Sequence, residues 1–534
     1  MNKNIMDWPA FIGALVLLVL VAGPLVMIPE FGAGAVEAAN TFVSQNFGVL
    51  YLLIGMGLFI FLMYIAFSRY GRIVLGNRGV KPEFNTLTWA AMLFAAGIGS
   101  SVLYWGTIEW AYYYTGPPFG IEAESNEAVT WAATYGIFHW GPIAWAIYCL
   151  PALPIAYFYY VRKRPVLKIS EACRPVLKKH ADGPIGTIVD VLFMFGLLGG
   201  AGTTMALATP LIAEGVDYFT GIEPSLTVNT LVLILCTMIF AVSSYSGLRN
   251  GIRVLSNVNL WLSVVLLGCI FVIGPTVFIS NTTINSIGML ADNFFRMSMW
   301  TEPFEDLGGF ETTGFPEAWT VFYWAWWLVY APFVGLFVAR ISKGRTIREM
   351  IVGTVLYGTI GCVLFFGIIG NFGLYLELSG QYSVVDVLNN DGAPAAIIGT
   401  IAQLPLSSLF VGIFVILAIV FLSTTFDSGS YILASVTQRY IDDEPLRWNR
   451  LFWAFVLAAP SLVLMYLGGL ETLQTASIVG GFPLIFIMGM LAVSFVRAVK
   501  EDNPKTFGSK YLIYADEKNK QDEKKPEEKN VDEA

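Results

Sequence analysis

Repeated apolar stretches, each about 20 residues long, constrain the fold of this chain more than any other feature of its sequence. Three of them are Phe11–Pro29, Leu50–Ser68 and Leu260–Ile279. A helix of this length crosses roughly 30 Å of hydrocarbon, the thickness of a bilayer core. Of the 534 residues, 56% are hydrophobic and 13% are charged, and a soluble protein has too little interior to bury that much apolar surface. The sequence therefore predicts an all-α membrane protein.

Twelve transmembrane helices account for these stretches. The first follows Lys3 and precedes small residues at Ala33–Ala39, as in a cleaved signal peptide, but its apolar core is too long for one. We therefore assign it as a span. The predicted spans lie near residues 10–29, 48–68, 87–115, 127–160, 183–213, 225–245, 257–280, 317–340, 350–376, 404–436, 448–467 and 473–498.

The basic residues support this topology, because they fall in alternate loops. Of the 31 lysines and arginines, only Arg296 lies on the other side. Cytoplasmic loops of membrane proteins carry the excess of basic residues. The pattern thus predicts twelve helices with both termini in the cytoplasm. The basic loops are Arg69 to Lys81, Arg162 to Lys179, Arg249 to Arg253, Arg340 to Arg348 and Arg439 to Arg450.

Two loops carry patterns of their own. Gly247–Leu255 alternates apolar and basic residues, which predicts a short amphipathic helix on the cytoplasmic surface. The outer segment Asn281–Pro316 is long and contains Trp300, Phe304 and Phe310, which suits an external lid. The charged C-terminal tail is typical of a solvated, disordered end.

Cysteine and histidine are too few and too scattered for a disulfide framework or a metal enzyme. The five cysteines have no paired spacing, and His139 and His180 are the only histidines. A membrane enzyme or a sensor without net transport is the alternative class. No convergent set of Ser, His and Asp supports an enzyme. We expect no cofactor other than a coupling ion and no nucleic-acid partner.

A run of small residues, Phe94–Ser101, lies in the middle of the third predicted span. One interpretation is close helix packing, because small residues let backbones approach each other. The other is an unwound helix whose free carbonyls meet an ion or a substrate carboxylate. Gly97 and Gly99 make such an interruption inexpensive.

Aromatic residues are concentrated in two segments, Phe138–Tyr148 and Trp319–Tyr330. Trp and Tyr are common at membrane interfaces, but here they continue two to three turns into the spans. Their helical spacing lets each set line one helix face. Such a face suits a trimethylammonium group, which has no N–H donor and is held by ring quadrupoles. The residues at this spacing are Trp140, Trp145, Tyr148, Trp326 and Tyr330.

A hydroxyl-rich patch, Phe421–Ser430, lies deep in the tenth predicted span. Single Ser and Thr residues usually bond to the carbonyl one turn back. Three hydroxyls beside Asp427 instead suggest hard oxygen ligands for Na⁺, and an intramembrane aspartate is a functional candidate. Asp427 could equally cap a broken helix or relay a proton.

These motifs make the sequence resemble the betaine/carnitine/choline transporter family. The most specific are WTVFYWAWW, Trp319–Trp327, followed by ARISKGRT, Ala339–Thr346; FHWGP, Phe138–Pro142, agrees with them. The resemblance implies a leucine-transporter-type fold with two inverted five-helix repeats, preceded by two extra helices. It also implies alternating access, a bacterial-type inner membrane and a homotrimer. The domains expected on this basis are 1–80 with two peripheral helices, 81–281 with the first repeat, 282–316 as an extracellular loop, 317–500 with the second repeat, and 501–534 as a cytoplasmic tail.

The resemblance also implies the site residues. Trp327 and Tyr330 fall where betaine carriers have two tryptophans, whereas carnitine carriers have Tyr at the second position. The stretches PPFG, GTIVD and LATPL look most like the carnitine-exchanger branch. The resemblance thus tilts the expected solute towards carnitine-like molecules without fixing the choice among glycine betaine, carnitine and choline. The expected substrate-binding residues are Trp140, Trp145, Tyr148, Trp326, Trp327, Tyr330, Tyr112, Gly97 and Gly99.

Coupling departs from the carnitine-exchanger pattern. Asn259 and Val334 stand where the sodium-independent exchanger has an arginine and a methionine. The sodium ligands of betaine symporters match Phe421, Thr424 and Thr425, with backbone carbonyls at Ala95 and Ile98. These matches favour Na⁺ symport, and sodium-independent exchange of carnitine-like solutes is the alternative. The family's other sodium position is only partly matched: Phe333 is present, but its threonines align with Leu197 and Ala201.

Overall fold

The computed structural model describes residues 5–77, 79–164, 168–246, 252–304, 312–441, 444–467 and 470–502. Within these ranges the chain is helical and forms no β-strand; two isolated bridges pair Met6 with Gln438 and Val74 with Thr346. The α-helices are α1 (Trp8–Met27), α2 (Pro29–Phe67), α3 (Thr86–Ile98), α4 (Ser101–Thr115), α5 (Asn126–His139), α6 (Pro142–Ala156), α7 (Ile169–Ala172), α8 (Arg174–Leu177), α9 (Pro184–Thr220), α10 (Leu226–Ser246), α11 (Ile252–Ile273), α12 (Thr276–Met299), α13 (Phe322–Ile341), α14 (Ile347–Phe365), α15 (Asn371–Leu378), α16 (Val384–Asp391), α17 (Ala393–Ala402), α18 (Ser407–Val436), α19 (Arg447–Leu467) and α20 (Leu470–Asp502). Short 3₁₀ or π turns join some of them: η1 (Arg69–Arg72), η2 (Tyr157–Val161), η3 (Lys178–Asp182), η4 (Pro316–Val321) and η5 (Phe366–Gly370).

Nine helices of the described ranges are long and apolar enough to cross a bilayer, or ten if one bent pair counts as a span. The sequence predicts twelve. The three predicted spans near 10–29, 87–115 and 257–280 account for the difference. The first has only a short apolar helix, the second is split into α3 and α4, and the third continues into α12 through a bend of 111°. A count of twelve and an inverted five-plus-five repeat therefore stay predictions.

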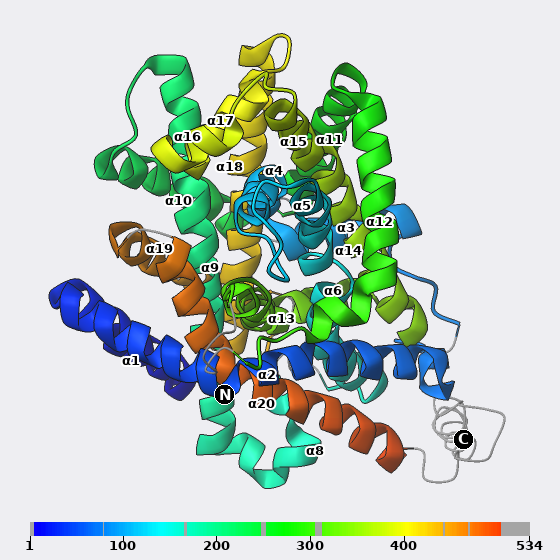
Figure 1. Ribbon diagram of the computed structural model, residues 1–534. Coiled ribbons are helices and arrows are strands. Elements are labelled where there is room, and N and C mark those ends of the chain that lie inside the picture. The colour runs from blue at the N-terminus through cyan, green and yellow to red at the C-terminus, as the bar shows by residue number, and fades with distance from the viewer. Residues whose placement is uncertain are drawn as a thin grey trace, which may run out of the picture.

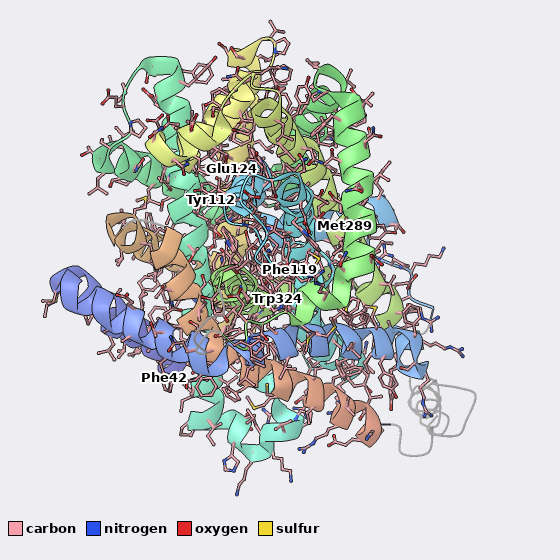
Figure 2. The ribbon with its side chains drawn as sticks, in the orientation of Figure 1. Phe42, Tyr112, Phe119, Glu124, Met289 and Trp324 are labelled. Atoms are coloured by element: carbon pink, nitrogen blue, oxygen red, sulfur yellow. The ribbon has the colours of Figure 1, made fainter. Side chains whose placement is uncertain are left out.

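Large apolar side chains cover the outside of the bundle. Val19, Leu231 and Val272 are 66%, 60% and 75% exposed. In Figure 2, Phe42 lies at the edge of the molecule, whereas Trp324 lies in its central part and is fully buried. Contiguous exposed apolar surface of this kind requires a non-aqueous neighbour. The chain is a multi-pass membrane protein.

The aromatic helix α13 occupies the centre of the bundle (Figure 1). It packs most extensively against α6, and also against α20 and α9. Close contact with α6 depends on Gly335, where an added Cβ would lie 2.7 Å from the Cβ of Pro151. The π turn η4 runs directly into α13, so the start of this helix is wider than a regular α-helix.

The segment expected to be an extracellular loop, 282–316, is helical over residues 282–299. Its first part belongs to α12, which meets α11 at the 111° bend. Gly274 and Pro275 separate the two helices. Of the predicted amphipathic helix Gly247–Leu255, residues 247–251 lie outside the described residues, and the remainder begins α11.

Ion pairs fix the ends of the bundle on the side of the basic loops. Arg162, which follows η2, bonds Asp502 at 2.8 Å and Glu501 at 3.0 Å at the end of α20. Lys168 pairs with Asp7, just before α1. The predicted tail beyond residue 502 lies outside the described residues.

The predicted interruption of the third span is present between α3 and α4. Gly99 ends α3 with φ 55° and ψ −154°, a backbone conformation that residues with a Cβ rarely adopt. An added Cβ there would lie 2.5 Å from Thr425 Oγ1 on α18. The break therefore lies directly against the hydroxyl-rich patch of the tenth predicted span.

Replacing Gly99 by Ala should destabilise the protein by about 1–3 kcal/mol, because Ala resists this backbone conformation and meets the Thr425 hydroxyl. The measurement is thermal unfolding of the purified protein in detergent, followed by tryptophan fluorescence. Gly57→Ala on α2 is the control, since an added Cβ there meets nothing within 4 Å. Equal midpoints for the two variants would contradict a strained break.

Candidate functional site

The hydroxyls of Thr424 and Thr425 lie on α18 opposite the α3–α4 break. Each donates to the carbonyl one turn back, Thr424 to Val420 at 2.7 Å and Thr425 to Phe421 at 3.1 Å. This is the ordinary structural use of a helical threonine. It employs only the hydroxyl hydrogen, so the oxygen lone pairs remain able to accept a donor or a cation.

Asn259 of α11 is the neighbour of this pair. Its amide nitrogen donates to Thr424 Oγ1 at 3.0 Å. Its carbonyl oxygen is fully buried and has no hydrogen-bond partner, and the same holds for the hydroxyl of Ser100 at the break. Buried polar atoms are rarely left unpaired. Neutral oxygens of this kind are the ligands that a hard monovalent cation accepts, so the donor set fits Na⁺.

The remaining residues expected at the cation site are placed only in part. Phe421 lies on the same helix as the two threonines and is buried. Ala95, Gly97 and Ile98 belong to the last turns of α3, and their side chains lie outside the described residues. Within the described part of the chain, no group of three His, Cys, Asp or Glu residues could hold a metal ion.

A second helix break positions the aromatic residues. Trp140 lies between α5 and α6, where Gly141 and Pro142 stop one helix and start the next. An added Cβ at Gly141 would lie 2.4 Å from the carbonyl oxygen of Ile137, so the chain makes this turn only with glycine. Trp145 and Tyr148 follow on α6.

Six of the expected substrate-binding residues form one buried cluster, which we call the aromatic cage: Trp140, Trp145, Tyr148, Trp326, Trp327 and Tyr330. Their rings pack mainly edge to face, and all six are at most 5% exposed. Separations below about 7 Å are those of interacting aromatic pairs, so the rings are in direct contact. Ring-centroid distances are 4.7 Å for Trp140–Trp327, 5.9 Å for Trp140–Trp326, 5.2 Å for Trp326–Trp327, 5.4 Å for Tyr148–Trp327, 5.7 Å for Trp145–Tyr148 and 6.3 Å for Trp326–Tyr330.

Tyr330 connects the cage to the α3–α4 break through α9. Its hydroxyl donates to the carbonyl of Gly200 at 2.7 Å and lies 2.5 Å from Thr204 Oγ1. Thr204 in turn accepts from Ser101 at 3.2 Å. Thr204 was not among the expected site residues, because nothing in its local sequence distinguishes it from other threonines. Through Ser101 it links the aromatic cage to the start of α4, beside the α3–α4 break.

Tyr112 lies outside the cage, in a neighbouring cluster. Its ring centroid is 5.5 Å from Trp319 and 6.1 Å from Trp105. Tyr323 links the two clusters, at 6.3 Å from Trp319 and 5.6 Å from Trp327. Figure 2 places Tyr112, like Trp324, in the central part of the molecule. Two rings, Trp319 and Tyr323, therefore separate Tyr112 from the cage walls.

Asp427 faces a different helix from the cation site. Its carboxylate accepts from Ser243 of α10 at 2.5 Å, and Ser430 on the next turn contacts Ser244 at 2.8 Å. It caps no interrupted helix, because α18 runs unbroken from Ser407 to Val436.

A lid stays a prediction for the outer segment. Trp300 lies 4.3 Å from Phe119 and 5.7 Å from Phe315, which lies 5.3 Å from Tyr113. Phe304 lines an open cavity of about 380 Å³ beside Arg296. Phe310 lies outside the described residues.

The sequence interpretation missed one buried carboxylate, that of Glu109. Glu109, in the middle of α4, is fully buried and accepts hydrogen bonds from Trp140, Tyr113 and Tyr323. The rule that singled out Asp427, an acidic residue inside an apolar span, applies equally to Glu109. The sequence interpretation of this region used only its aromatic residues.

Comparison with known proteins identifies relatives over most of the chain. Residues 9–504 match the family model described as betaine/carnitine/choline family transporter. The uncharacterized transporter YeaV of Escherichia coli (strain K12) is 36% identical over 454 residues, which cover 84% of this chain and 92% of that protein. A solved structure described as the substrate-bound outward-open state of a Na⁺-coupled sialic acid symporter aligns over 86% of each chain, with 14% identity and a TM-score of 0.44.

Proposed function

Since this chain belongs to the betaine/carnitine/choline family of transporters, we propose that it carries a small quaternary-ammonium solute across the membrane by secondary active transport. Members of the family are transporters and not enzymes, and this chain is likewise a transporter and not an enzyme. Glycine betaine, carnitine and choline are the solutes that we propose to test first.

The aromatic cage is the observation that carries this proposal. A trimethylammonium group offers no hydrogen-bond donor, so polar groups cannot bind it specifically. A desolvated aromatic ring attracts it by about 2 kcal/mol. The rings contact one another directly, so binding requires them to separate. Such a movement suits a carrier that opens its site alternately to each side.

We propose Na⁺ as the coupling ion, held by the hydroxyls of Thr424 and Thr425 and by backbone carbonyls of Phe421, Ala95 and Ile98. Support comes from the position of the threonine pair against the Gly99 break and from the neutral amide of Asn259 beside it. An arginine in place of Asn259 would supply a fixed positive charge and make a cation unnecessary. The ion, when bound, would draw α18 and the α3–α4 break together.

The family resemblance extends this proposal to the assembly. We propose twelve helices with two inverted five-helix repeats, both termini in the cytoplasm, a bacterial-type inner membrane and a homotrimer. The alternation of basic loops supports the placement of the termini.

Sodium-independent exchange of carnitine-like solutes is the second candidate. Tyr330, at the position where carnitine carriers have Tyr, favours it, as do threonine hydroxyls that already bond to their own helix. In an exchange mechanism, the hydroxyls of Thr424 and Thr425 would only stabilise their own helix.

Uptake of labelled glycine betaine, carnitine and choline into proteoliposomes should be accelerated by an inward Na⁺ gradient. The same liposomes with equal Na⁺ on both sides, or with K⁺ in its place, are the controls. Uptake that ignores the gradient but needs solute inside would refute symport and support exchange. No uptake of any of these solutes would refute the choice of substrate class.

Replacing Trp327 by Leu should weaken binding of the transported solute roughly tenfold or more, because a desolvated cation–π contact is lost while apolar volume is largely kept. Isothermal titration of the purified protein measures this affinity for the solute. Trp261→Leu is the matched control, because Trp261 lies on α11 and is 66% exposed. Unchanged affinity in the Trp327 variant would remove this residue from the site.

Changing Thr424 and Thr425 together to Ala should raise the Na⁺ concentration that gives half-maximal uptake, because two hard oxygen ligands are removed. Ser435→Ala is the control, since Ser435 lies on the same helix and bonds to the carbonyl of Tyr431. An unshifted Na⁺ dependence in the double variant would assign the threonines to helix packing.

A further inference from the structure

Glu109 lies directly behind one wall of the aromatic cage. Its Oε2 accepts the indole N–H of Trp140 at 2.9 Å and the hydroxyl of Tyr323 at 2.5 Å. Its Oε1 accepts the hydroxyl of Tyr113 at 2.5 Å. Three donors thus converge on one carboxylate, which is the arrangement that suits an ionised group, because that form only accepts hydrogen bonds.

His139 completes the surroundings of this carboxylate without neutralising it. Its Nδ1 lies 2.8 Å from the Tyr113 hydroxyl and 3.8 Å from Glu109 Oε1, and its Nε2 lies 3.1 Å from Thr320 Oγ1. The tautomer with its hydrogen on Nδ1 donates to Tyr113, while Tyr113 donates to Glu109. A neutral imidazole therefore satisfies the hydrogen bonds that join Thr320, His139, Tyr113 and Glu109.

Glu109 has no fixed positive partner in the described part of the chain, since no Lys or Arg there forms an ion pair with it. A buried carboxylate without a counter-charge is costly even when it is hydrogen-bonded. The helix retains it beside a cage whose proposed ligand is a permanent cation. An onium group in the cage would supply the missing counter-charge.

Two of the cage tryptophans have their N–H groups engaged in hydrogen bonds. Trp140 donates to Glu109, and Trp327 donates to the carbonyl of His139 at 2.9 Å. A charged acceptor makes the first bond the stronger of the two and adds negative charge at the edge of the Trp140 ring. Both effects favour a cation in front of that ring over a neutral group of equal size.

We infer that Glu109 is the buried counter-charge of the aromatic cage, a positioning and specificity-determining residue that makes the site select positive charge rather than the shape of a trimethyl head group. This inference rests on the proposed function, because it requires an onium ligand in the cage.

The test compares each onium solute with its tert-butyl isostere, in which carbon replaces the quaternary nitrogen. Glycine betaine and choline, each with its isostere, are titrated into the purified full-length protein. Wild-type protein should bind the onium member more tightly. Glu109→Gln, which keeps the side-chain shape, should weaken onium binding roughly tenfold or more and leave isostere binding nearly unchanged.

Two further variants separate charge from structure. Glu109→Asp keeps the charge and should keep the preference for the onium solute, even if both ligands bind less tightly. Tyr323→Phe removes one donor to the carboxylate and should also keep the preference. Thermal unfolding of each variant verifies that it is folded.

Each remaining outcome has a distinct meaning. If Glu109→Gln weakens the onium solute and its isostere equally, or keeps the wild-type preference, the carboxylate serves only to hold Trp140 and the inference is wrong. If Glu109→Gln is unfolded, loss of the preference in Glu109→Asp also overturns it. If wild-type protein binds none of the onium solutes, the proposed function fails first.

Discussion

Hydrocarbon offers no hydrogen bond to an open backbone, and the architecture of this carrier follows from that constraint. A helix can be interrupted only where protein surrounds it. The interruption at Gly99 against α18 and the one at Trp140 and Gly141 against α13 meet this condition. Each creates a place where side chains approach from several helices at once. The proposed cation site and the aromatic cage occupy these two places.

The two places are joined by a layer of polar contacts that the apolar exterior conceals. Tyr330 and Thr204 connect the cage to Ser101 beside the first break, and Glu109 with His139 forms the layer behind Trp140. These groups are buried, so removing one partner leaves the other unsatisfied in a medium of low polarity. Packing of the aromatic rings and saturation of the polar layer therefore depend on each other.

Local pattern was sufficient for some of this structure and insufficient for the rest. A break was one of two interpretations of the small residues of Phe94–Ser101, and the structure has it between α3 and α4. The helical spacing grouped Trp145 and Tyr148 on α6, whereas Trp140 lies in the break before that helix and joins the cluster through Trp327. Helix α12 was missed because its sequence, rich in Asn and Ser, lacks the continuous apolar run of a span.

Residues whose role depends on a distant partner could not be predicted in the same way. Thr204 acquires its position from Tyr330, which is 126 residues away in sequence, and nothing in its own segment encodes that contact. Tyr112 carries the right chemistry for the cage but is separated from it by Trp319 and Tyr323. Glu109 was detectable as an acid within an apolar span, yet its three donors come from two other helical regions as well as its own.

The contact between Asn259 and Thr424 joins residues that are 165 positions apart, and this separation has a consequence for biogenesis. A chain that has been synthesised only as far as α13 already contains every ring of the aromatic cage, but it lacks α18 and both threonine hydroxyls. A ligand that binds the folded state shifts the folding equilibrium towards it in proportion to its concentration. Under the proposed function, solute and cation together stabilise only chains in which α18 has been inserted, so ligand binding would distinguish a complete carrier from an incomplete one.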